Sequence, residues 1–233
     1  MEATSSSSSR RIRALVTAAG ANAALFAATA VVVMLVPGVW GLDRAVTGIA
    51  AESRSPALDL LARALATIGD TAGTSAITLL AGLVLAASRR LRGAVFVVAT
   101  VASGALASTV LKTVFERPRP DGAYLVSVPA SASFPSGHVV AAVCLAGALT
   151  ALLLAAPSTS RRVKAIALTA SAVWVVTMAA SRVYLGVHYA SDVIGGALLG
   201  AAVVCASAAV CVAWDFGRRD SQAGRVTPPA GRA

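Results

Sequence analysis

The chain has 233 residues, of which 57% are hydrophobic and only 13% are charged, and its formal net charge is +10. This composition excludes an ordinary soluble domain, in which about 25% of residues carry charge. A nucleic-acid partner is also not expected, because the Lys and Arg residues lie in the gaps between apolar runs. The lipid bilayer is therefore the expected solvent, and the cell membrane the expected location.

Apolar runs of the length that crosses a membrane as a helix, about 17–25 residues, recur along the chain. We expect six spans, at residues 14–36, 72–88, 93–111, 138–156, 165–181 and 193–214. The predicted fold is thus all-α, a multi-pass membrane protein whose six transmembrane helices form one domain over residues 14–214. The Ser-rich segment 1–13 and the Gly-, Pro- and Arg-rich segment 215–233 are expected to be disordered.

An additional amphipathic helix is expected over residues 55–70, between the first and second spans. Ser55 and Pro56 are typical of a helix start. One face then carries apolar side chains, namely Leu58, Leu61, Leu65 and Ile68. The opposite face carries Asp59, Arg63 and Asp70, so we expect the helix to lie along the outer membrane interface. It would either pack over the bundle or control the entry of lipid.

The distribution of Lys and Arg predicts the orientation of the spans. Thirteen of these residues fall on one side, mainly at 10–13, 89–92, 161–164 and 218–232, and seven fall on the other. Because cytoplasmic loops carry the excess of positive charge, both termini should be cytoplasmic. Three polar clusters, described next, then emerge at the extracytoplasmic face.

The first cluster begins at the end of the third span with Lys112. Arg119 follows in a loop stiffened by Pro118 and Pro120. A Lys and an Arg at this separation can hold phosphate oxygens, the Arg through its planar fork and the Lys as a point charge. Arg117 precedes Pro118 in the same Arg-Pro pattern, so either arginine can be the ligand, and the spacing from Lys112 favours Arg119.

The second cluster is Pro135-Ser136-Gly137-His138, directly before the fourth span. Proline and serine are common at an ordinary helix start. The same geometry makes an anion site, because free backbone N–H groups and the positive end of the helix dipole point outward. Gly137 would let a phosphate approach the backbone, and His138 would donate a proton to a leaving oxygen.

The third cluster contains Arg182, His188 and Asp192. His188 and Asp192 are four residues apart, so on one helix they would share a face. A carboxylate bonded to one ring nitrogen leaves the other nitrogen free as a nucleophile. Arg182 would supply a third cation for a phosphoryl group.

Together the three clusters resemble the signature of the type 2 phosphatidic acid phosphatase (PAP2) superfamily, which also includes the vanadium haloperoxidases. The matching positions are Lys112 with Arg119-Pro120, then Pro135-Ser136-Gly137-His138, then Ser181-Arg182 with His188 and Asp192. The resemblance covers about residues 70–214, and six spans are similar to the membrane branch of that family. Residues 1–69 match it only in topology.

The resemblance implies a role for each matched residue. His188 would attack phosphorus to give a phosphohistidine, with Asp192 orienting it and His138 acting as acid and then base. Lys112, Arg119 and Arg182, with Ser136 and Gly137, would bind the phosphate. No metal or other cofactor is implied.

The expected function is therefore that of a membrane lipid phosphatase. The candidate substrates are an isoprenoid diphosphate such as undecaprenyl diphosphate, phosphatidylglycerol phosphate and phosphatidic acid. The predicted topology favours the isoprenoid diphosphate. A phosphotransferase of the same superfamily and a non-catalytic lipid transporter or scaffold are the alternatives, and the oligomeric state is left open.

Overall fold

The computed structural model describes residues 2–122 and 124–226, and within them the chain forms eight α-helices and no strand. The all-α fold predicted from the sequence is confirmed. In chain order the helices are α1 (Glu2–Leu35), α2 (Pro37–Glu52), α3 (Pro56–Ile68), α4 (Thr71–Ala87), α5 (Leu91–Phe115), α6 (Gly137–Ala155), α7 (Arg161–Tyr184) and α8 (Ala190–Val226).

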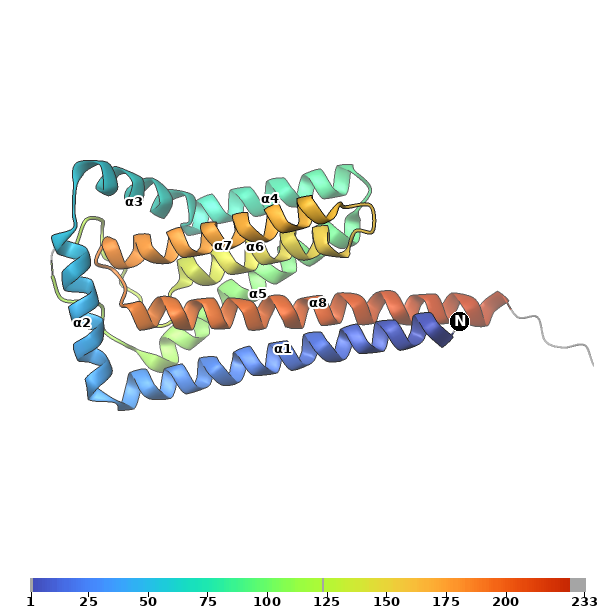
Figure 1. The fold of residues 1–233 in the computed structure, drawn as a ribbon, viewed down its shortest axis with the longest axis horizontal. Helices are drawn as coiled ribbons and strands as arrows, with labels where there is room; N and C mark the ends of the chain where they lie inside the picture. The colour runs from blue at the N-terminus through green and yellow to red at the C-terminus, as the bar shows by residue number, and fades with distance from the viewer. Residues whose placement is uncertain (1, 123, 227–233) are drawn as a thin grey trace, which may run out of the picture.

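The long helices form one elongated bundle, shown in Figure 1. Helix α6 is central, because it packs against α5, α7 and α8, while α1 runs beside α8 for most of its length. Helix α2 crosses one end of the bundle, next to α3 (Figure 1). The start of α1 and the end of α8 lie together at the opposite end.

Five of the described helices are long and apolar enough to cross a membrane. These are Ser8–Leu35, Leu91–Phe115, Gly137–Ala155, Arg161–Tyr184 and Ala190–Trp214. The count rises to six if α3 and α4, which meet at a bend of 56°, form one broken span. The expected second span, 72–88, coincides with α4, and the total of six remains a prediction.

The outer surface of the bundle is apolar, which suits a lipid environment. Leu83, Leu106 and Val176 are each more than 60% exposed. Inside, small residues bring the helices close together: a Cβ added at Gly104 would lie 2.5 Å from Sγ of Cys144 on the facing helix. Because apolar side chains gain little by leaving lipid, close contacts of small residues hold such a bundle together.

Helix α2 was not predicted from the sequence. Pro37 occupies its first turn, where the missing N–H is not needed. Trp40 lies in this helix and donates from its ring nitrogen to the Val33 carbonyl at 2.9 Å. Asp43 is the buried residue of α2, and it points toward the site described below.

Helix α3 forms within the expected stretch, but the bundle contacts a different face from the leucine-rich one. Ala62 and Ala66 are buried against Leu185 and Val187, in the turn that leads to His188. The expected apolar face is largely exposed, as seen at Leu58, Leu61 and Ile68. The packing role is therefore carried by alanines, and a position at the membrane interface remains a prediction for the leucine-rich face.

Helix α1 begins at Glu2 and α8 continues to Val226, so both helices extend into the segments 1–13 and 215–233. The disorder expected for these two segments stays a prediction. Once a long apolar span has nucleated a helix, each further residue adds one hydrogen bond at little cost in conformational entropy. The helix can therefore extend into the polar sequence beside the span. Residues 1 and 227–233 lie outside the described residues.

Candidate active site

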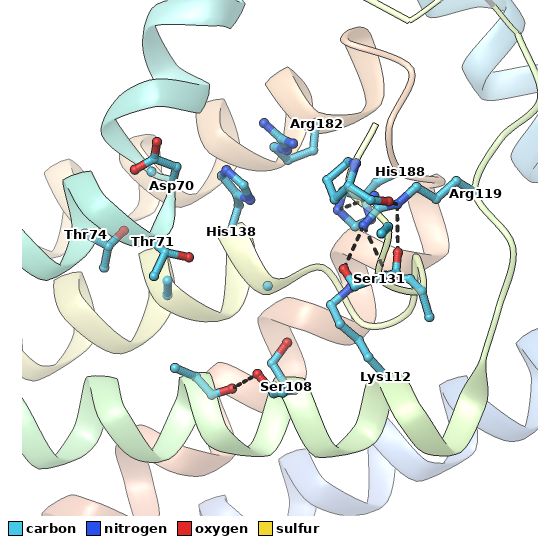
Figure 2. Close-up of a pocket in the computed structure, with 18 of the residues that line it drawn as sticks. Asp70, Thr71, Thr74, Ser108, Lys112, Arg119, Ser131, His138, Arg182 and His188 are labelled. Carbon is cyan, nitrogen blue, oxygen red and sulfur yellow. Dashed lines mark hydrogen bonds between the residues drawn. The ribbon is translucent and has the colours of Figure 1, made fainter. Parts of the chain in front are cut away.

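A cavity of about 920 Å³ opens where α3 meets α4 and where α5, α6 and α7 have their ends. Six of the expected site residues line it: Lys112, Arg119, Gly137, His138, Arg182 and His188. Figure 2 shows Arg182 between the two histidines, Arg119 beyond His188, and Lys112 on the opposite wall. The structure thus brings together residues separated by up to 76 positions in the sequence.

Helix ends position these side chains. Lys112 lies in the last turn of α5, Gly137 begins α6, and Arg182 lies in the last turn of α7. A turn then leads to His188, and Gly186 adopts a φ of 79° there, a conformation that favours glycine. Because each helix ends where its apolar pattern ends, the polar residues that follow the patterns gather at one end of the bundle.

His188 and Asp192 interact, but they do not share a helix as expected. His188 lies in the turn before α8, and Asp192 lies in the first turn of that helix. Nδ1 of His188 is 3.4 Å from Oδ2 of Asp192, and the same oxygen accepts the backbone N–H of Tyr189 at 2.9 Å. Burial lowers the pKa of His188 to about 4, although Asp192 opposes the shift. The ring is therefore neutral near pH 7.

The other ring nitrogen of His188, Nε2, faces Arg119. Nη1 of Arg119 lies 3.4 Å from Nε2 and donates to the Val187 carbonyl at 2.7 Å. Nε of Arg119 donates to the Ser131 carbonyl at 3.0 Å. Partial burial lowers the pKa of Arg119, and the charge of Asp192 opposes the shift. The guanidinium is held rigidly beside the nitrogen that the cavity exposes.

The remaining cations approach from two other helices. Nζ of Lys112 donates to the carbonyl of Ala132 and lies 3.5 Å from that of Ser133. Arg182 is only 3% exposed, and its Nε has no hydrogen-bond partner among the described residues. A buried cationic group with an unused donor is costly unless an anion completes its bonding. The arrangement therefore suits an anionic ligand.

The second cluster brings two of its three expected site residues to the cavity. Gly137 and His138 line the cavity at the start of α6, and the His138 ring donates to the backbone carbonyl of Ala66. Ser136, expected to bind phosphate, is fully buried and is not among the lining residues. Its backbone N–H donates to the Asp192 carbonyl at 3.0 Å, so the tight packing beside α8 turns this residue away from the cavity wall.

Tight packing of the loop before α6 explains this position. The Phe134 ring stacks on Phe26 of α1 with centroids 5.6 Å apart. A Cβ at Gly195 would lie 2.4 Å from the Phe134 ring, and a Cβ at Gly196 would lie 2.7 Å from the Ser136 carbonyl. Only glycines allow α8 to approach this closely.

The sequence left open whether Arg117 or Arg119 is the phosphate ligand, and the two arginines occupy different positions in the structure. Both terminal nitrogens of Arg117 bind carboxylates: Nη1 lies 2.5 Å from Oδ1 of Asp192, and Nη2 lies 2.7 Å from Oδ2 of Asp43. The guanidinium of Arg117 therefore binds Asp192 and Asp43, whereas that of Arg119 faces the cavity. Asp43 was not predicted as a site residue, because a single acidic residue in a segment without a predicted helix is not part of any recognisable motif.

A second group of missed residues lines the part of the cavity nearest His138. Asp70, Thr71 and Thr74 come from the α3–α4 junction and lie on the His138 side in Figure 2. Ser108, one turn before Lys112 on α5, is 3% exposed, and its hydroxyl has no hydrogen-bond partner in the described part of the chain. Its position four residues before Lys112, on the same face of a helix, is the sequence feature that could have predicted it as a site residue.

Comparison with known proteins identifies the family. The family model of the PAP2 superfamily matches residues 92–216, more than half of the chain. Phosphatidylglycerophosphatase B of Bacillus subtilis (strain 168) is 31% identical over 163 residues, which cover 70% of this chain and 79% of the relative.

Two crystal structures have a similar fold. One is a transmembrane PAP2-type phosphatidylglycerolphosphate phosphatase from Bacillus subtilis, with a TM-score of 0.77 and 26% identity, covering 86% of this chain and 96% of that one. The other, LpxE of Aquifex aeolicus, has a TM-score of 0.57 and 24% identity, covering 71% and 94%. The chain therefore belongs to the PAP2 superfamily and is a membrane lipid phosphatase of that superfamily.

Proposed function

We propose that the chain hydrolyses a terminal phosphate from a lipid head group through a phosphohistidine at His188, and that phosphatidylglycerol phosphate is its substrate. The observation that carries the mechanism is the position of His188. Asp192 lies at one ring nitrogen, and the other faces a cavity whose walls carry Lys112, Arg119 and Arg182.

In the first step, the lone pair of His188 Nε2 forms a bond to phosphorus. The bond from phosphorus to the lipid oxygen breaks, and that oxygen takes a proton from His138. Nδ1 keeps its proton and donates it in a hydrogen bond to Asp192. The carboxylate of Asp192 stabilises the positive charge that develops on the ring. Because burial keeps His188 neutral, its nucleophilic nitrogen is available at neutral pH.

In the second step, a water molecule attacks the phosphohistidine. His138, now neutral, accepts a proton from that water as the new oxygen–phosphorus bond forms. The nitrogen–phosphorus bond breaks, its electron pair returns to Nε2 of His188, and inorganic phosphate leaves. The two histidines then have their original protonation states, because His138 has regained from water the proton that it gave to the leaving oxygen.

The cations bind the three oxygens that carry charge in the transition state. Arg119 is closest to the attacking nitrogen, with Nη1 at 3.4 Å from Nε2, and is the arginine we assign to phosphate binding. Arg182 has an unused donor, and the Ser108 hydroxyl is buried without a partner beside Gly137. We assign Ser108 as an additional donor to the phosphate, in place of the Ser136 hydroxyl.

Two observations support phosphatidylglycerol phosphate over the isoprenoid diphosphate that the topology favoured. Both Bacillus subtilis relatives are named for this activity. In addition, the hydroxyl-lined wall near His138, formed by Thr71 and Thr74 with Asp70, is where the leaving alcohol would lie. A glycerol head group can hydrogen-bond to such a wall, whereas a second phosphate would face the Asp70 carboxylate.

We further propose that the site faces the outside of the cell and that catalysis needs no metal ion. The excess of Lys and Arg at the end of the bundle that carries both termini supports this orientation. Within the described residues, no three His, Cys, Asp or Glu side chains come together as a metal site would require. Activity should therefore persist in EDTA.

The test measures phosphate release by purified protein in detergent from phosphatidylglycerol phosphate, phosphatidic acid and undecaprenyl diphosphate. We expect the first to have the highest kcat/KM and His188→Ala to abolish turnover without changing the thermal unfolding midpoint. His188→Ala with full activity would refute the mechanism. A higher kcat/KM on the diphosphate would refute only the substrate assignment.

Product analysis distinguishes the alternative functions. Transfer of the phosphoryl group to an added lipid or sugar alcohol, with no free phosphate, would show a phosphotransferase. Binding of lipid without any turnover of the panel would show a transporter or scaffold.

A further inference from the structure

A chain of buried charged groups extends from His188 to helix α2. Asp192 contacts His188 on one side and Arg117 on the other, and Arg117 then contacts Asp43. The side chains of Arg117 and Asp192 are 0% exposed and that of Asp43 is 3% exposed. The carboxylates of Asp43 and Asp192 bind the two terminal nitrogens of Arg117, and Nε of Arg117 has no partner among the described residues.

The contacts fix the orientation of Asp192. Its Oδ1 receives Nη1 of Arg117 at 2.5 Å, so Oδ2 is left for His188 and for the backbone N–H of Tyr189. A carboxylate bonded at both oxygens cannot rotate away from the imidazole. The nitrogen that Asp192 engages on His188 is thereby the same one in every molecule.

Asp43 fixes the orientation of Arg117 in turn. Its Oδ2 accepts Nη2 of Arg117 at 2.7 Å, and both of its oxygens bind Ser191, next to Asp192. The rings of Trp40 and Tyr189 lie 4.9 Å and 4.4 Å from the guanidinium carbon. The guanidinium is therefore held by carboxylates at its edge and by aromatic rings at its faces.

The charge balance of the group also matters. One Arg between two carboxylates leaves a net charge of −1 next to His188, in a region without access to water. A buried negative charge stabilises a positive charge that develops on the imidazole during attack on phosphorus. Loss of the Asp43 charge would leave the Arg117–Asp192 pair neutral and would free one side of the guanidinium.

We propose that Asp43 and Arg117 are positioning residues for the phosphoryl-transfer reaction, and that α2 holds Asp192 against His188 through them. This inference rests on the proposed role of His188. It extends the functional unit to residues 37–52, which lie outside the segment 92–216 matched by the family model. Residues before the motifs then contribute to the rate and not only to the fold.

The decisive variant is Asp43→Asn, which keeps the size of the side chain and removes its charge. We expect kcat to fall about 10- to 100-fold, the range known for outer-shell partners that orient metal-binding histidines. KM and the inhibition constant for vanadate should change less than about threefold, because the cavity cations are untouched. Glu52→Gln is the matched control: an exposed carboxylate on the same helix, expected to have no effect.

A double-mutant cycle tests whether Asp43 acts through Arg117. In an Arg117→Met background, Asp43→Asn should reduce kcat less than about twofold further, because the link is already broken. Effects that multiply in the double variant would overturn the proposal. A wild-type kcat in Asp43→Asn would also overturn it. The same holds if KM and the inhibition constant for vanadate rise by as large a factor as kcat falls.

Ser191→Ala provides a milder change if Asp43→Asn does not fold, as judged by size-exclusion chromatography and the thermal midpoint. Ser191 Oγ lies 2.7 Å from Nη1 of Arg117 and 2.5 Å from Oδ2 of Asp43. We expect kcat to fall about 2- to 10-fold with KM unchanged, and an unchanged kcat would overturn the proposal. If His188→Ala stays active, the proposed function itself fails, so the two failures are distinguishable.

Discussion

Nδ1 of His188 lies 3.4 Å from Oδ2 of Asp192 although the two residues are not on the same helix. The contact depends on the turn through Tyr189, whose backbone N–H binds the same carboxylate oxygen at 2.9 Å. The start of α8 therefore fixes the carboxylate, and the carboxylate fixes the imidazole. The following predictions depend on this geometry and on the cations around it.

Asp192→Asn should reduce kcat by about 100-fold or more, because an amide can present its N–H to His188 and favour the wrong tautomer. Phosphate release from phosphatidylglycerol phosphate measures the effect. Asp121→Asn, at an exposed position in the loop after Arg119, is the control and should leave kcat unchanged. Equal loss in both variants would contradict a specific role for Asp192.

The protonation of His188 should show a midpoint near pH 4. Burial lowers its pKa, and the groups facing it are Asp192, Arg119 and Lys112. The ring is neutral above this midpoint and becomes protonated, and unable to attack phosphorus, as the pH falls through it. Because a phosphomonoester itself titrates at about pH 6, the rate of carbethoxylation of His188, followed by mass spectrometry, is the better measurement. A midpoint near 6.5 would contradict the effect of burial.

Arg182→Ala should weaken inhibition by vanadate, a phosphate mimic, by about 10- to 100-fold, the range typical of a hydrogen bond to a charged group. The reason is that the guanidinium has an unused donor at the cavity. Arg63→Ala is a suitable control, since Arg63 lies on α3 and is exposed. Unchanged inhibition in Arg182→Ala would remove this residue from the phosphate site.

Ser108→Ala should reduce kcat/KM by about 2- to 10-fold, the effect of losing one hydrogen bond. Its hydroxyl is buried without a partner beside Gly137. Thr109→Ala provides the comparison, because the Thr109 hydroxyl already donates to the Ala105 carbonyl at 2.9 Å. An increase in stability without any loss of activity would show that the Ser108 hydroxyl binds no substrate.

Cysteine labelling should establish the orientation in the membrane. In a background that lacks Cys144, Cys205 and Cys211, a membrane-impermeant maleimide should label Ser127→Cys in intact cells. Ser158→Cys, in the turn between α6 and α7, should be labelled only after permeabilisation. The reverse pattern would place the active site on the cytoplasmic side.

The sequence was sufficient to predict the helices that carry the site, because long apolar runs can only be helical in a bilayer. It also predicted that Lys112, Arg119, His138 and Arg182 would share a cavity with His188. Each of these residues lies near the end of an apolar run, so the ends of the runs located them. Short-range spacing likewise indicated that His188 would contact Asp192.

Only the tertiary structure could assign the groups whose partners are distant in the chain. Asp43 meets Arg117 across 74 residues, and no periodicity or motif marks such a pair. Tight packing around Gly195 and Gly196 decided that Ser136 would lie away from the cavity wall. The physical reason is the same in each case: apolar patterns depend on the solvent around a segment, whereas the direction of a buried polar side chain depends on which other segments pack against it.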